Sequence, residues 1–84
     1  MNLYYLSSCK KFAAYNKSTR YNFVVIRRDN SDAIGWIRLF DNGSPLGRWM
    51  FDPLLTPLSQ TDLLDISGLI GKIREAYEEE LDKP

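Results

Sequence analysis

The sequence predicts an α+β domain in which an antiparallel sheet of three to four strands packs one face against one long or two short C-terminal helices. Two observations lead to this fold class. Residues 21–52 contain aromatic and β-branched runs separated by turn residues, a pattern typical of antiparallel strands. Residues 60–81 repeat apolar side chains at spacings of three and four, which indicates an amphipathic helix. The chain has 84 residues, enough for one core, so we expect a single domain over residues 1–84.

The strands are expected in chain order, each ending at turn-forming residues. Asn42-Gly43 is the strongest turn signal, because both residues tolerate the positive φ that a two-residue hairpin requires. The sequence does not decide whether residues 7–18 form a loop, a strand extension or a helical turn, and it assigns no role to residues 8–20. The expected strands are residues 3–6, 21–28, 33–41 and 44–52.

The helix has a recognisable start. Ser59, with Asp62 three residues later, matches a capping motif that also places an acid at the positive end of the helix dipole. Gly68 and Gly71 weaken the middle of the helix. One long helix over residues 60–81 and two shorter helices that break near Gly68 are therefore both open.

Strand pairing assigns the two faces of the sheet. Placing Val25 opposite Trp36, and Trp36 opposite Trp49 across the hairpin turn, puts both tryptophans on one face. We interpret that face as a binding surface, because Trp, Tyr and Arg are enriched at binding hot spots; the alternative, that the helix covers it, stays open. The first face holds Tyr21, Phe23, Val25, Arg27, Ile34, Trp36, Arg38, Phe40, Trp49 and Phe51. The face expected under the helix holds Asn22, Val24, Ile26, Arg28, Ala33, Gly35, Ile37, Leu39, Leu46, Arg48 and Met50.

Composition argues against an enzyme. The chain has no histidine and one cysteine, Cys9, so histidine-based catalysis and the common zinc sites are excluded, and we expect no cofactor or metal.

No stretch is long and apolar enough for a membrane span or a signal peptide, so we expect a cytoplasmic protein. Residues 1–50 carry a net charge of +5 and residues 51–84 one of −5. Two interpretations stay open: the halves complement each other within the chain, or each half meets a partner of opposite sign.

Several stretches resemble a small phage-encoded type I-F anti-CRISPR protein. They are the run from residue 21 to 52, with Asn42-Gly43-Ser44 and the closing Phe51-Asp52, the start Tyr5-Leu6-Ser7, and residues 70–76. The resemblance implies a four-stranded antiparallel sheet with two helices. It also implies binding to the Cas7-type backbone subunits of a CRISPR surveillance complex, in a bacterial host, which blocks pairing of target DNA with the guide.

The resemblance places a functional tyrosine of that family on Tyr5. Two further functional positions, an aromatic residue and an acid in the family, correspond to Arg27 and Arg38, so the residue types differ there. The predicted function is a non-enzymatic inhibitor that binds its protein partner through Tyr5, Arg27, Trp36, Arg38 and Trp49.

Two alternatives stay open. One is a small cytoplasmic protein–protein interaction module, including a homodimer that forms through the same face. The other is a module that binds single-stranded nucleic acid, since arginines and aromatic residues on a sheet suit base stacking. The zero net charge of the whole chain disfavours a nucleic-acid ligand.

Overall fold

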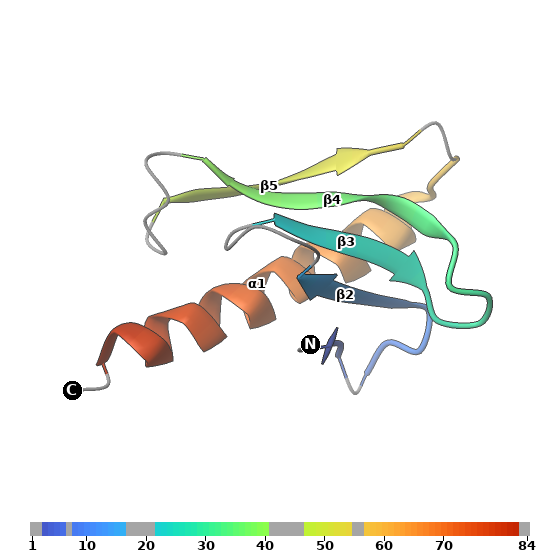
Figure 1. Cartoon of the computed structure of the whole chain (residues 1–84). Helices are drawn as coiled ribbons and strands as arrows, with labels where there is room; N and C mark the ends of the chain where they lie inside the picture. Colours follow the sequence, from blue (N-terminus) through green and yellow to red (C-terminus); the bar gives the residue numbers. More distant parts are fainter. Residues whose placement is uncertain (1–2, 7, 17–21, 41–46, 55–56, 83–84) are drawn as a thin grey trace.

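The computed structural model describes residues 3–6, 8–16, 22–40, 47–54 and 57–82. These residues form an antiparallel sheet and a C-terminal helix, so the predicted α+β class is confirmed (Figure 1). The sheet has five strands, where three to four were expected. The elements are β1 (Leu3–Tyr4), β2 (Phe12–Asn16), β3 (Asn22–Arg27), β4 (Ala33–Phe40), β5 (Arg48–Pro53) and α1 (Gln60–Asp82).

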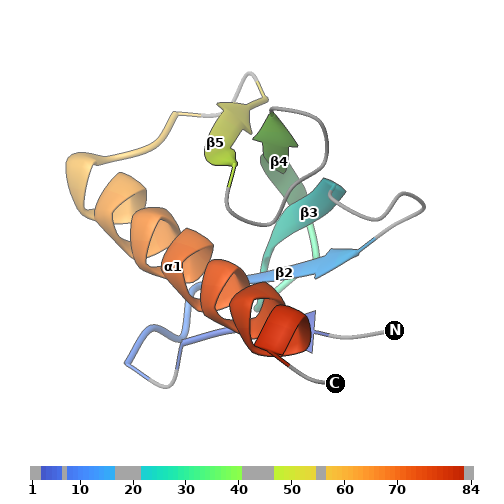
Figure 2. The ribbon, with the colours of Figure 1, turned by 90° about the vertical axis from the view of Figure 1, so that its left-hand side faces the viewer.

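The sheet is a meander in which every strand pairs with the next one along the chain, in the order β1-β2-β3-β4-β5. The additional strand is β2, which lies in the stretch that the sequence left open. It pairs with β3 over its whole length, from Phe12 opposite Arg27 to Asn16 opposite Phe23. Helix α1 crosses one face of the sheet, as the two views in Figures 1 and 2 show.

The core lies between α1 and this face. Ile66, Leu69 and Ile73 are its fully buried helical residues, and they recur at the spacing of one helix face. Opposite them, Phe23 contacts Trp49 at 5.8 Å between ring centroids and Tyr77 at the same distance. The remaining buried members of the cluster are Cys9, Phe12, Ala14, Val25, Ile34 and Ile37.

The predicted helix start is confirmed. The Asp62 backbone N–H donates to the Ser59 hydroxyl oxygen, and the Ser59 backbone N–H donates to the Asp62 carboxylate, both at 3.1 Å. Lys11 donates to the other carboxylate oxygen at 3.1 Å and so ties the start of β2 to the helix. Helix α1 then continues through Gly68 without a break, so one long helix is correct and two short ones are wrong.

The register between β3 and β4 differs from the prediction by one residue. Val25 pairs with Gly35 rather than with Trp36, because the turn between the strands is built differently. The backbone N–H of Ser31 donates to the Arg27 carbonyl, and Ser31 has a positive φ of 62°. Ile34 is the extra residue of a β-bulge beyond this turn. Because side chains alternate, a slip of one residue exchanges the faces of β3 relative to β4.

The register between β4 and β5 differs by three residues, which exchanges the faces again. Trp49 pairs with Leu39 and not with Trp36, and Phe40 pairs with Arg48. A two-residue turn at Asn42-Gly43 would have paired these strands differently, and the turn itself lies outside the described residues. The faces predicted for residues 35–40 of β4 are therefore correct relative to α1. Ile34, at the bulge, was predicted on the binding face but lies in the core. The faces predicted for β3 and β5 are wrong.

Candidate functional site

One face of the sheet is not covered by α1, and a row of side chains crosses it from edge to edge. We call this surface the open face. Paired residues of neighbouring strands lie side by side on it, in the order Leu3, Tyr15, Val24, Trp36 and Asp52. Val24 is only 3% exposed, because the larger Tyr15 and Trp36 flank it. The row thus forms an apolar floor with an acid at the β5 end.

A second group of side chains on β4 and β5 lies next to this row on the open face. Arg38 lies opposite Met50, and Phe40 lies opposite Arg48. Phe40 is 45% exposed and Met50 is 38% exposed, so the two add apolar surface next to this row. The Arg48 guanidinium lies 3.5 Å from the Met50 sulfur, so the charged and apolar groups are interleaved.

Arg38 links the two groups. Its guanidinium carbon lies 5.7 Å from the centre of the Trp36 ring, within reach of a cation–π interaction. Its Nε also lies 3.5 Å from a carboxylate oxygen of Asp52. Both partners of this ion pair are about half exposed, and such pairs contribute little to stability. Arg38 is therefore oriented by Trp36 and Asp52 but stays accessible to a ligand.

The five residues that the sequence predicted for partner binding do not form one surface. Trp36 and Arg38 lie together on the open face, as expected. Trp49 instead packs beneath α1, where it is 9% exposed and its ring centroid lies 5.7 Å from that of Tyr77. Arg27 lies on the helix-covered side of β3, with its guanidinium 5.8 Å from the Phe12 ring centre. The register differences described above are the reason for both misplacements.

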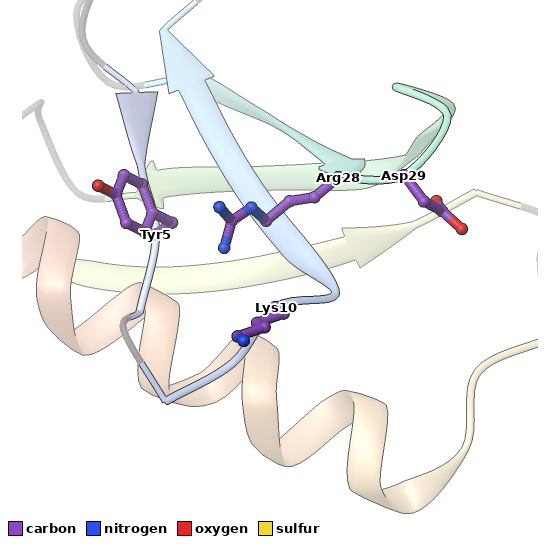
Figure 3. Close-up of a pocket in the computed structure, with 4 residues that line it drawn as sticks. All are labelled: Tyr5, Lys10, Arg28 and Asp29. Atoms are coloured by element: carbon purple, nitrogen blue, oxygen red, sulfur yellow. The ribbon is translucent and has the colours of Figure 1, made fainter.

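Tyr5, the fifth predicted residue, lies apart from Trp36 and Arg38 in a hollow beside β1 and β2. It follows β1, and the guanidinium carbon of Arg28 lies 4.8 Å from its ring centre. Together with Lys10 and Asp29 these residues line a shallow cavity of about 400 Å³ (Figure 3). We call it the edge pocket.

Sequence reasoning missed Arg48 and Met50, which lie on the open face, and Arg28, which lines the edge pocket. It had assigned all three to the face beneath the helix. An unpaired arginine is costly in a core, but each predicted face held two arginines, so this signal could not decide which face lies beneath the helix.

A metal centre does not compete with these surfaces in the part of the chain that the structure describes. No group of three His, Cys, Asp or Glu side chains among them is placed to hold a metal ion. In the same residues no helix has the length and apolarity that a membrane span requires. Comparison of the chain with protein-family models, curated proteins and solved structures found no match.

Proposed function

We propose that this chain is a non-enzymatic, protein-binding inhibitor that docks through its open face. The observation that supports the proposal most is the group of Trp36, Arg38, Phe40, Arg48 and Met50 on an uncovered sheet. Aromatic residues, Met and Arg are enriched in protein interfaces, and Trp and Arg dominate binding hot spots. Large apolar side chains that stay exposed beside charged ones are typical of a docking surface and not of a core.

In its specific form, the proposal is that the partner is a Cas7-type backbone subunit of a type I CRISPR surveillance complex, and that binding blocks target DNA. The support for this partner is the resemblance of residues 21–52 and of Tyr5 to the anti-CRISPR family. Arg38 and Arg48 on the open face would pair with acidic groups of the partner through charge-assisted hydrogen bonds. Trp36 and Phe40 would supply the apolar area.

Affinity capture with purified type I surveillance complexes tests both levels of the proposal. We expect the wild-type chain to bind one of them, and Trp36→Ala to weaken that binding by about thirtyfold or more, the loss expected for a hot spot of about 2 kcal/mol. Lys72→Ala, at an exposed position of α1, is the matched control and should bind as the wild type does.

The possible results test the docking surface and the proposed partner separately. If no type I complex binds the chain, the proposed partner is wrong. If a complex binds but Trp36→Ala binds equally well, the open face is not the docking surface. A dimer in light scattering that Trp36→Ala dissociates would identify a second copy of the chain as the occupant. Oligonucleotide binding that falls steeply with salt would replace the protein partner with a single strand of nucleic acid.

A further inference from the structure

The edge pocket is a second concave feature, formed where three segments of the chain meet. Because neighbouring strands are antiparallel, β1 ends, β2 begins and β3 ends at the same edge of the sheet. Tyr5 follows β1, Lys10 precedes β2, and Arg28 and Asp29 follow β3. Figure 3 shows the Arg28 side chain reaching across β2 toward the Tyr5 ring, with Lys10 below the guanidinium in this view.

Arg28 is held in place by several contacts. Its backbone N–H donates to the Lys11 carbonyl at 2.8 Å, which continues the pairing between β2 and β3. One guanidinium nitrogen donates to the Cys9 carbonyl at 3.4 Å. The Tyr5 ring lies 4.8 Å from the guanidinium carbon and adds a cation–π contact. These contacts position the side chain and leave other guanidinium N–H groups without a partner among the described residues.

The two cations of the edge pocket are not neutralised within the part of the chain that the structure describes. No carboxylate oxygen there lies within 4.0 Å of the Arg28 or Lys10 nitrogens, whereas the neighbouring Lys11 forms an ion pair with Asp62 at 3.1 Å. Asp29 lines the rim, but its carboxylate points away from the guanidinium in Figure 3. The pocket therefore has a formal net charge of +1.

We propose that the edge pocket binds one carboxylate group, that of a glutamate or aspartate side chain presented by another protein. The planar guanidinium of Arg28 offers parallel N–H donors that match a carboxylate, and Lys10 adds a mobile positive charge. The cavity is shallow, which suits a single side chain on a protein surface. Only the source of the carboxylate depends on the proposed function; the chemistry of the pocket stands without it.

The charge balance favours a carboxylate over a phosphate. A phosphate group carries close to two negative charges at neutral pH and more acceptor oxygens than Arg28 can satisfy while it also donates to the Cys9 carbonyl. The Asp29 carboxylate at the rim repels a dianion more strongly than it repels a monoanion. One monoanionic carboxylate instead neutralises the net charge of the pocket.

Titration of the isolated full-length chain, followed by ¹H–¹⁵N NMR spectroscopy, tests this inference without any partner. The probe is glutamate blocked at both ends, with blocked glutamine as the neutral control and inorganic phosphate as the competing anion. We expect saturable shifts of the Arg28 Nε–H signal and of the amides of residues 9–12 with blocked glutamate alone. Arg28→Met should weaken that binding about tenfold or more, the loss expected for one charge-assisted hydrogen bond.

Lys10→Met provides a second variant that leaves the contacts of Arg28 with Cys9 and Lys11 in place, and it should also weaken binding. Arg74→Met, at an exposed site on α1 whose side chain pairs with Glu78, is the matched control and should leave binding unchanged. Equal shifts with blocked glutamine, or no saturable shift with either probe, would overturn the site. Tighter binding of phosphate than of blocked glutamate would overturn the carboxylate assignment. None of these results depends on whether a CRISPR complex binds the chain.

Discussion

Trp36 and Trp49 lie on adjacent strands of one sheet and on opposite faces of it. Trp49 is enclosed by Phe23 and Tyr77 beneath α1, whereas Trp36 stands on the open face beside Arg38. The side chains are identical, so their different surroundings arise from register alone. The comparison shows that aromatic content does not identify a binding face in this chain. What marks the open face is that large apolar residues, Phe40 and Met50, stay exposed there beside Arg38 and Arg48.

The largest difference between the two faces should appear when each tryptophan is truncated. Trp49→Ala removes a large side chain from the core and should lower the free energy of unfolding by about 3–5 kcal/mol. Trp36→Ala should lower it by about 1 kcal/mol, because Trp36 is only half-buried. Urea unfolding followed by circular dichroism measures both losses. In partner capture the order is expected to reverse for variants that remain folded, with Trp36→Ala the more damaging.

Equal losses of stability in the two variants would contradict the comparison. Such a result would mean that Trp36 is covered in solution, as it would be by a second copy of the chain. Light scattering of the wild-type chain would then decide whether the cover is a second copy.

A smaller effect is expected where the covered face is most crowded. Gly35 lies beneath the Phe51 ring, and a Cβ added there would come within 2.5 Å of a ring carbon and 2.6 Å of the Asp52 carbonyl oxygen. Since the carbonyl belongs to the backbone of β5, that strand would have to move. Gly35→Ala should therefore cost about 1–3 kcal/mol of unfolding free energy, the range found for overpacked cores.

Gly71 gives the matched control for this substitution. A Cβ added there meets nothing within 4 Å, and the residue lies inside α1. Gly71→Ala should raise the free energy of unfolding by about 0.5–1 kcal/mol, because alanine is the better helix former. The same chemical change thus has opposite signs at two sites. A stabilising effect of Gly35→Ala would show that Phe51 does not press on β4.

The parts of the fold that depend on local sequence were predicted correctly. The helix start follows from Ser59 and Asp62, which are three residues apart and need no other part of the chain. Strands β3 and β4 follow from their β-branched and aromatic runs. Strand β2 was not predicted, because its sequence Phe-Ala-Ala-Tyr-Asn has no clean alternation and its two alanines have low strand propensity. Pairing with β3 supplies the order that its own sequence lacks.

The candidate site could be predicted only in part, for the same reason. Trp36 and Arg38 were placed correctly, since the small Gly35 next to Trp36 marks the opposite face of β4, where other groups approach closely. Trp49 and Arg27 were misplaced, because their faces depend on the bulge at Ile34 and on the connection between β4 and β5. The bulge has no strong local signal, and the strong turn signal of Asn42-Gly43 predicted a pairing of β4 and β5 that differs from the one observed. The edge pocket could not be predicted at all, since three separate segments form it only in the folded chain.

A further effect concerns the contacts of Asp62 that hold the start of α1 against the sheet, and it depends on pH. The backbone N–H of Ser59 and the Lys11 ammonium both donate to the Asp62 carboxylate and lower its pKa in the folded state. This group therefore stabilises the fold at neutral pH. Its contribution is lost on acidification, as the pH falls from the ordinary carboxyl pKa of about 3.9 through the lower pKa of the folded state. At neutral pH we expect Ser59→Ala, which removes the hydroxyl that accepts from the Asp62 N–H, to cost about 1 kcal/mol.

Unfolding of Asp62→Asn at pH 7 and at progressively lower pH checks this dependence. The wild type should be more stable than the variant at pH 7, and the difference should shrink on acidification, because protonation removes the charge that the variant lacks at every pH. Lys11→Met should reduce stability at pH 7, whereas Lys10→Met, whose side chain has no carboxylate partner among the described residues, should not. A difference that grows as the pH falls would mean that Asp62 is held in its neutral form. The helix would then be fastened to the sheet by its apolar residues alone, and the ion pair with Lys11 would contribute nothing to the covered face.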